Sequence, residues 1–335
     1  MAEFGRSYMI RDNKGFALMI VIVVMLLASF LASQLILSVK TELVISQNVK
    51  SRIIGNYLAE AGMNMAIFRV LGQTPLDLPA FGEEEEWLHF FEGFQYEFFL
   101  PLGRVTYYAV SESGKIDLNR SPPRLIELFL EYKLGEEKEE EIATIMDSLL
   151  DWRDNDDLHR LNGAESEFYE SLDDPYIARN GALEDVNEFF LIHGTESLAG
   201  QFDAMDVFSV YNAQNNGKIN INSLTPAMLN FLSNNNSEAV EAYREAKKEF
   251  EGKLPLSVMT EILGEERYGE LSPFFTNTSS ANKFFFIVGT GQPGLEENAA
   301  LDPESPRKTA GSQNSVIIQK NGTNYTFMTW QERYI

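Results

Sequence analysis

The sequence predicts an α+β chain in which a long N-terminal helix precedes a sheet and a helical region interrupts that sheet. Two patterns support this fold class: a helical pattern of apolar residues runs from Phe16 to Leu71, and strand-like segments lie on both sides of a helical middle. A hydrophobic content of 44% is enough for a substantial core, and 335 residues leave room for two ordinary domains.

The chain is strongly acidic and contains no cysteine. A formal net charge of −23 repels nucleic acid phosphates and acidic lipid headgroups, whereas it suits a solvated exterior and a bound cation. The absence of cysteine excludes disulfides and thiolate zinc sites.

The first apolar segment is long enough to span a membrane. Phe16 to Val39 contains no charged residue, and 24 helical residues reach roughly 36 Å against a hydrocarbon core of about 30 Å. Arg6, Arg11 and Lys14 precede it, so we expect a cytoplasmic N-terminus and a globular part on the other side. A cleaved secretory signal would have a shorter apolar region of about 7–15 residues.

The helical pattern continues from Thr41 to Leu71. Its apolar residues recur at helical steps, at Ile45, Val49, Ile53, Tyr57, Ala61, Met65 and Phe68. We expect this amphipathic stretch to cover a sheet.

The strands of that sheet are predicted in two groups. Phe94–Leu100 and Arg104–Ser111 form one hairpin, Phe284–Gly289 is a single strand, and Asn321-Gly322 joins two further strands, 315–320 and 324–330. Gly289 to Gly294 matches GxGxxG, but no helix follows as dinucleotide binding requires, so we interpret it as a glycine-rich loop. Gln292–Ser312 is predicted to be a linker-like loop.

The helical middle contains an internal repeat. Gly114-Lys-Ile-Asp-Leu-Asn is echoed by Gly217-Lys-Ile-Asn-Ile-Asn, and each copy precedes a helical start. A spacing of about 100 residues is too long for a solenoid unit, so the copies are expected to open two related helical bundles. The predicted helices are Pro123–Tyr132, Glu136–Arg153, Leu183–Ile192 and Ser237–Phe250.

The repeat is also similar to helix-hairpin-helix modules, some of which bind DNA. The alternative function is therefore a membrane-anchored DNA-binding protein of an uptake system. Around Asn220 the only nearby basic residue is Lys218, and the surrounding domain is acidic. We prefer a structural turn whose asparagine side chains cap the next helix, and we expect no nucleic acid partner.

The densest polar cluster lies between Glu136 and Glu188, where 18 Asp or Glu face 4 Lys or Arg. Crowded carboxylates destabilise a fold unless a cation neutralises them, and calcium takes 6–8 oxygen ligands. The cluster is not an EF-hand, because His159 stands where that loop needs glycine. A solvated acidic surface is the alternative, but the interleaved Trp152, Tyr169 and Tyr176 favour an ordered site.

The sequence gives little sign of catalysis. Its three histidines are scattered, and it has no HExxH, GxSxG or P-loop motif. A pair of acids could serve a glycosidase, but the sequence cannot establish a substrate cleft around them. We expect no catalytic residues and no enzyme.

The junction before the apolar helix resembles the prepilin leader of type IV pilins and type II secretion pseudopilins. A short charged leader ends in Gly15-Phe16 directly before the apolar run. The resemblance implies that a prepilin peptidase cuts after Gly15 and methylates Phe16. Most members carry a Glu five residues into the mature chain, but here that position holds Ile20. A subunit without this acid is expected at the end of a filament.

The acidic cluster resembles that of the K-type minor pseudopilins of type II secretion. The similar residues run from Leu150-Asp-Trp-Arg-Asp154 through Gly163-Ala-Glu165 and Tyr169 to Pro175-Tyr176, Asn180, Leu183 and Glu188. The resemblance implies a pilin-like fold, a long helix packed on an antiparallel sheet, with a large inserted all-α domain that binds calcium. The motif does not fix the ligands; we expect Asp154, Asp156, Asp157 and Glu165, with Asn180 as a further one.

This family implies a domain order and a set of partners. We expect a leader at 1–15, an assembly helix at 16–39, pilin-like parts at 40–112 and 279–335, and the inserted domain at 113–278. The implied role is non-catalytic, at the tip of the pseudopilus, in filament initiation or capping and in export of folded proteins across the outer membrane. The implied partners are I- and J-type minor pseudopilins, the pseudopilus, the prepilin peptidase and the inner-membrane secretion platform. The implied location is the inner membrane, with a periplasmic globule.

Overall fold

The computed structural model describes residues 14–72, 90–211, 216–278, 283–294 and 311–335. They fall into two compact units, Met1–Ile53 and Ile54–Ile335. Most of the expected leader lies outside the described residues. A single helix, α1 (Lys14–Val70), contributes to both units. In the described part of the chain, α1 is the one helix long and apolar enough to cross a membrane, and its most apolar stretch is unburied.

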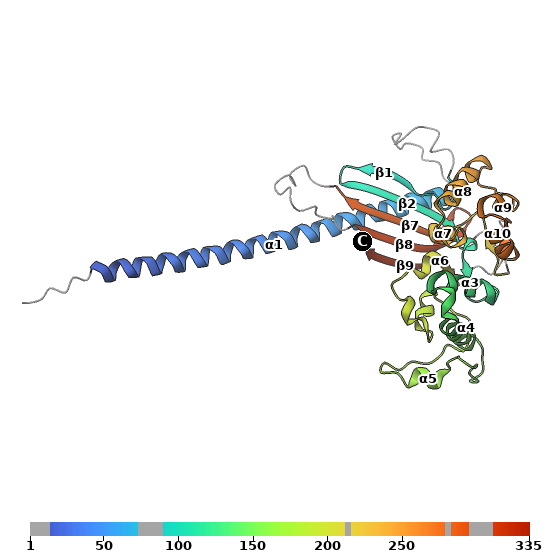
Figure 1. Ribbon diagram of the computed structural model, residues 1–335. Helices are drawn as coiled ribbons and strands as arrows, with labels where there is room; N and C mark the ends of the chain where they lie inside the picture. The colour runs from blue at the N-terminus through green and yellow to red at the C-terminus, as the bar shows by residue number, and fades with distance from the viewer. Residues whose placement is uncertain (1–13, 73–89, 212–215, 279–282, 295–310) are drawn as a thin grey trace, which may run out of the picture. The chain divides into compact units, whose positions relative to one another are not determined.

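The second unit is built on an antiparallel sheet with the order β1-β2-β7-β8-β9 (Figure 1). Its strands are β1 (Tyr96–Leu100), β2 (Gly103–Ser111), β7 (Phe284–Pro293), β8 (Ser312–Asn321) and β9 (Asn324–Tyr334). Leu100 pairs with Gly103 and Asn321 with Asn324, so both predicted hairpins are confirmed. In each hairpin, tight-turn residues join strands of strand-forming composition.

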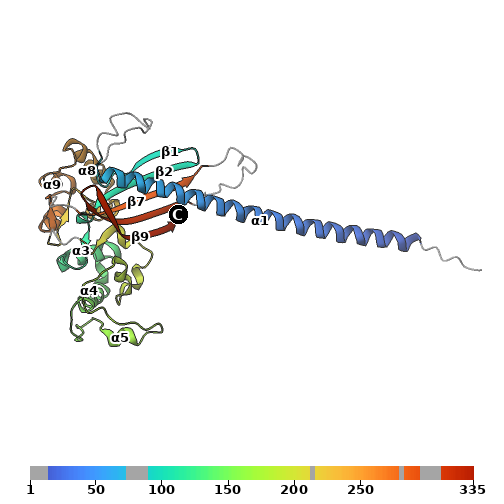
Figure 2. The same ribbon diagram turned by 180° about the vertical axis from the view of Figure 1, so that it is seen from behind.

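The C-terminal end of α1 packs on one face of this sheet, which Figure 2 shows with the helix in front of the strands. Leu58, Met63 and Ala66 of α1 share a buried core with Val105, Ile287 and Val316 of the strands, among others. Pairing of this helix with the sheet confirms the expected fold class. The predicted contact face was only partly right: Ile53 and Tyr57 are exposed, whereas Met65 packs against this core.

Glycines explain why a different face of α1 is buried. A Cβ at Gly291 of β7 would overlap the carbonyl oxygen of Gly55, and one at Gly289 would overlap the backbone of Ala59 and Met63. The helix therefore approaches the strand more closely than side chains of ordinary size permit. The interpretation of 289–294 as a glycine-rich loop was wrong for the same reason: β7 continues to Pro293, and its glycines form the helix-packing surface.

The other face of the sheet is continuous with the core of the helical region. Phe286, Val288 and Ile317 of the sheet belong to the same buried cluster as Phe129, Phe208 and Phe231 of the insert. The α-helices there are α3 (Pro123–Leu134), α4 (Glu139–Arg153), α5 (Ser166–Glu170), α6 (Ala204–Val207), α7 (Pro226–Leu232), α8 (Ser237–Glu249), α9 (Val258–Leu263) and α10 (Glu265–Leu271). Short 3-10 helices are η1 (Glu112–Gly114), η2 (Glu136–Lys138), η3 (Val186–Leu191), η4 (Thr195–Leu198) and η5 (Ser272–Phe274).

Two predicted helices differ from the structure. The prediction of one helix over 136–153 is interrupted, because η2 precedes α4. The segment predicted as Leu183–Ile192 forms only the 3-10 helix η3. Asp185 and Glu188 form a capping box at its start. The 3-10 turn buries Val186 and Phe189, which are three residues apart, on one side.

The internal repeat opens two modules of similar construction. Ile116–Asp117 (β3) pairs in parallel with Phe208–Ser209 (β4), and Ile219–Asn220 (β5) pairs in parallel with Phe275–Thr276 (β6). Each repeat copy is followed by a helix, α3 or α7, which has a proline in its first turn. The repeat is therefore a structural element that begins each helical module, as expected.

Asparagine side chains tie each module together. Asn119 Nδ2 donates to Leu183 O at 2.9 Å, and Asn119 Oδ1 accepts from Leu183 N at 2.8 Å. In the second module, Asn222 Oδ1 accepts from Leu254 N at 2.8 Å. The prediction that asparagine side chains cap the next helix was wrong, because Pro122 precedes α3 without a side-chain cap and Thr225 caps α7. The asparagines instead bond backbone groups of distant segments, which is still a structural role.

Candidate functional site

Three of the expected ligand residues converge at the end of α4. Asp154 follows the last residue of this helix, Asp156 lies in the loop after it, and Glu165 directly precedes α5. One carboxylate oxygen from each lies within 4.8 Å of the others. Glu165 is buried, Asp154 is half-buried and Asp156 is exposed, so the cluster opens to solvent on the Asp156 side.

The oxygens of this cluster are poorly satisfied by the protein. Asp154 Oδ1 and both carboxylate oxygens of Glu165 are buried, and they have no hydrogen-bond partner in the part of the chain that the structure describes. Burial raises the pKa of Glu165 to about 7, and the negative charges of Asp151 and Asp154 contribute to this rise. A buried acceptor without a donor costs free energy, which a bound cation would offset.

The other two expected residues form a pair beside the cluster. Asn180 Nδ2 donates to Asp157 Oδ1 at 3.2 Å, while Asn180 Oδ1 is buried and has no partner among the described residues. Asn180 has a φ of 48°, a left-handed conformation that asparagine tolerates better than most residues. The pair joins the loop after α4 to the segment before η3, and the three-carboxylate cluster does not include Asp157.

Sequence reasoning missed the residues that hold the loop in place. Asp151 is fully buried in the last turn of α4, and its Oδ2 accepts from Arg160 N at 3.0 Å. Arg160 Nη1 pairs with Asp151 and donates to Asp154 Oδ2 at 2.8 Å. A Cβ at Gly163 would overlap Asp151 Oδ2, so a larger residue there would displace this carboxylate. The sequence signal for this arrangement was Gly163, which follows a run of acidic residues and Arg160.

Aromatic side chains support the acidic loop. Trp152 and Tyr169 are buried with ring centroids 5.1 Å apart in an edge arrangement, and Tyr169 stacks on Tyr176, also at 5.1 Å. Trp152 Nε1 donates to Glu188 Oε2 at 3.5 Å. These contacts give the acidic loop an ordered base, which was the reason for preferring a site over a solvated surface.

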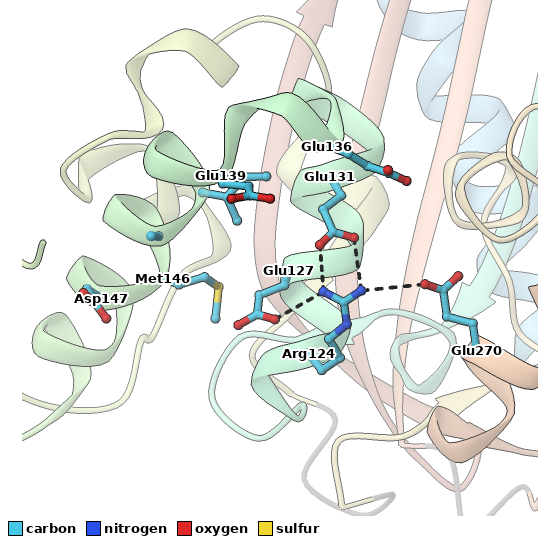
Figure 3. A pocket seen from close by; sticks show the side chains of 10 residues that line it. Arg124, Glu127, Glu131, Glu136, Glu139, Met146, Asp147 and Glu270 are labelled. Atoms are coloured by element: carbon cyan, nitrogen blue, oxygen red, sulfur yellow. Dashed lines mark hydrogen bonds and ion pairs between the residues drawn. The ribbon is translucent and has the colours of Figure 1, made fainter.

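A second acidic surface lies between α3, α4 and α10 and encloses a pocket of about 510 Å³ (Figure 3). Its acids surround Arg124, which contacts Glu131 at 2.7 Å, Glu127 at 3.4 Å and Glu270 at 3.7 Å. This arginine already supplies a counter-charge, so the pocket differs from the cluster at Glu165, where buried oxygens lack donors.

Comparison with known proteins gives a family match and similarity to solved structures. Residues 111–199 match the family model described as type II secretion system (T2SS), protein K, and this range contains every residue of the acidic site. The chain is also similar to a chain in the crystal structure of the GspK-GspI-GspJ complex from the enterotoxigenic Escherichia coli type 2 secretion system. The identity is 14% and the TM-score 0.48, over 88% of this chain and 98% of that chain. Comparison with curated protein sequences finds no match.

Proposed function

We propose that this chain is a K-type minor pseudopilin of a type II secretion system and that it acts at the tip of the pseudopilus. In this role it initiates or caps the filament and supports export of folded proteins across the outer membrane, without catalysis. The match over residues 111–199 is the observation that carries the proposal, because it covers most of the first helical module. A wide insert beside the sheet leaves little room for a further subunit above it.

The helix α1 fits the anchoring and assembly part of this role. Its apolar segment is long enough to span a bilayer, and the basic residues before it favour a cytoplasmic N-terminus with a periplasmic globule. Ile20 stands where most pseudopilins have an acid, which suits a subunit with no neighbour above it. The prepilin peptidase would cut after Gly15 and methylate Phe16, and the platform in the inner membrane would take up the mature chain.

We further propose I- and J-type minor pseudopilins as partners. The E. coli structure holds GspK together with GspI and GspJ. The corresponding subunits in this protein's own secretion system are the first candidates for its partners.

The acidic cluster fits calcium by the chemistry of its donors. All its donor atoms are oxygens, and several of them are buried without a partner among the described residues. Calcium accepts many oxygen ligands in flexible geometry. Asp154, Asp156 and Glu165 would hold the ion, with Asp157 and Asn180 available from the adjacent pair. Bound there, the ion supplies positive charge that neutralises the cluster and fixes the loop to α4.

A complementation experiment tests the proposed function. In a strain that lacks its own K-type gene, the full chain should restore secretion of an exoprotein and lose its leader. Mass spectrometry should then find a mature N-terminus at Phe16 that carries one methyl group. Gly15→Leu is expected to block both processing and secretion. Secretion by unprocessed chains that still begin at Met1 would contradict the proposal.

A further inference from the structure

Strand β9 is an exposed sheet edge of unusual composition. It is the last strand in the sheet order, and within the described ranges no further strand lies beyond it. Its residues Asn324 to Gln331 carry no charge, although the chain as a whole has a net charge of −23. Proteins usually protect a long edge strand with lysine, proline or short length, and this strand has eleven residues with neither lysine nor proline.

An aromatic stripe runs along β9. Tyr325, Phe327 and Trp330 are 37%, 45% and 43% exposed, and their rings contact one another at centroid distances of 5.2 and 5.6 Å. A register shift beside Ile317 lets Phe327 pair with Ile318 and Trp330 pair with Val316. The two aromatic side chains therefore lie on one face despite their odd spacing.

The stripe continues the apolar face on which α1 packs. Val316 and Ile318 of β8 belong to the buried core that α1 covers, and they pair with Trp330 and Phe327 of β9. Burial ends abruptly between these two strands, since β8 is mostly buried and β9 is mostly exposed. An interface rich in aromatic residues and Met and poor in charge is typical of a buried protein contact.

The exposure pattern of β9 favours a strand as the occupant. Residues on both faces of β9 are exposed, including Thr326 and Met328 as well as the aromatic stripe. A helix would cover one face only and would leave the outer backbone groups of β9 without partners. An added strand satisfies those groups and places cross-strand side chains against the stripe.

The direction of α1 relative to β9 argues against antiparallel pairing with the β9 strand of a second copy, and it favours a different subunit. Gly55 of α1 lies at Ser312 and Val70 O accepts from Lys320 Nζ, so this part of α1 runs parallel to β8 and antiparallel to β9. If β9 paired antiparallel with another β9, the two Ile54 ends would face opposite directions. In each copy the chain leads from this end to its apolar segment. Two copies anchored in one membrane need these ends on the same side.

We propose that the outer edge of β9 binds an extended strand of a different subunit, whose uncharged apolar or β-branched side chains cover Tyr325, Phe327 and Trp330. The proposal rests on the proposed function, because it names the kind of contact that joins this chain to its assembly partners.

Photo-crosslinking in cells tests this contact. The full chain would carry benzoylphenylalanine at position 327 or, as a matched control, at Phe99, which is 63% exposed on the opposite edge strand β1. The unmodified chain and the Phe99 variant should restore secretion, and position 327 alone should crosslink to another secretion subunit, at a residue that peptide mapping places in an extended strand. In the purified complex, amide exchange over Asn324–Gln331 should slow at least tenfold.

Each other outcome overturns the proposal. A crosslink to a second copy of this chain would assign the edge to self-association, and one mapped to a helix or to lipid would exclude strand addition. Secretion that is restored without a crosslink at 327 would refute this contact and leave the proposed function standing. Loss of secretion with the unmodified chain would instead refute the proposed function.

Discussion

Substitution Glu165→Gln should stabilise the metal-free protein and abolish its response to calcium. The pKa of Glu165 is raised from 4.5 to about 7, mainly because the side chain is buried. Between these values the folded state holds a proton that the unfolded state has lost, so stability falls as pH rises through this window. Above pH 7 the full cost is present, and this rise in the pKa of Glu165 corresponds to about 3 kcal/mol.

The magnitude sets the expected change in melting temperature. A neutral amide removes the charge, so the metal-free variant should melt up to about 10 °C higher at pH 7.5, given about 2–4 °C for each kcal/mol in a domain of this size. At pH 4.5 the variant and the wild type should melt together. Calcium at about one hundred times its dissociation constant should add about 2.7 kcal/mol to the wild type only.

Circular dichroism melts of the full chain in detergent, with EDTA or with calcium, measure both effects. Glu167→Gln is the matched control, because Glu167 is an exposed acid two residues further along the chain, in α5. A Glu165→Gln variant that melts lower than the wild type in EDTA, yet keeps the full calcium response, would refute the reasoning.

Two further predictions concern packing and a buried lysine. Gly291→Ala should lower the free energy of unfolding in urea by about 1–3 kcal/mol, because the added methyl group overlaps the α1 backbone. The control Gly269→Ala, in α10 with open space around the position, should be neutral or stabilising. Equal effects of the two substitutions would exclude close packing of α1 on the sheet. Burial lowers the pKa of Lys247 to about 8, so its cost to stability is present below pH 8 and disappears as pH rises toward 10.5. Denaturation between pH 8 and 10.5 should show a gain in stability that Lys247→Met lacks, and parallel pH curves would contradict this.

Periodicity predicted the elements of this fold better than it predicted their contacts. The hairpins followed from strand-like segments and an Asn-Gly turn, because these signals are local. The buried face of α1 could not be found in this way. The aromatic residue Tyr57 lies outside, whereas Gly55 and Gly62 lie against the sheet. Close backbone packing is a property of two segments together, and hydrophobicity alone does not reveal it.

The acidic cluster shows the same limit at the level of a site. Charge density indicated where a cation would be useful, and three of the five chosen residues meet in space. Which of the neighbouring acids can bind a cation depends on Asp151. This residue pairs with Arg160 and thereby fixes the direction of the other carboxylates in the loop. A buried positioning acid is indistinguishable in sequence from a ligand, since both are aspartates at the end of one helix. Only the direction of each side chain separates the residue that holds the loop from those that the loop presents to a cation.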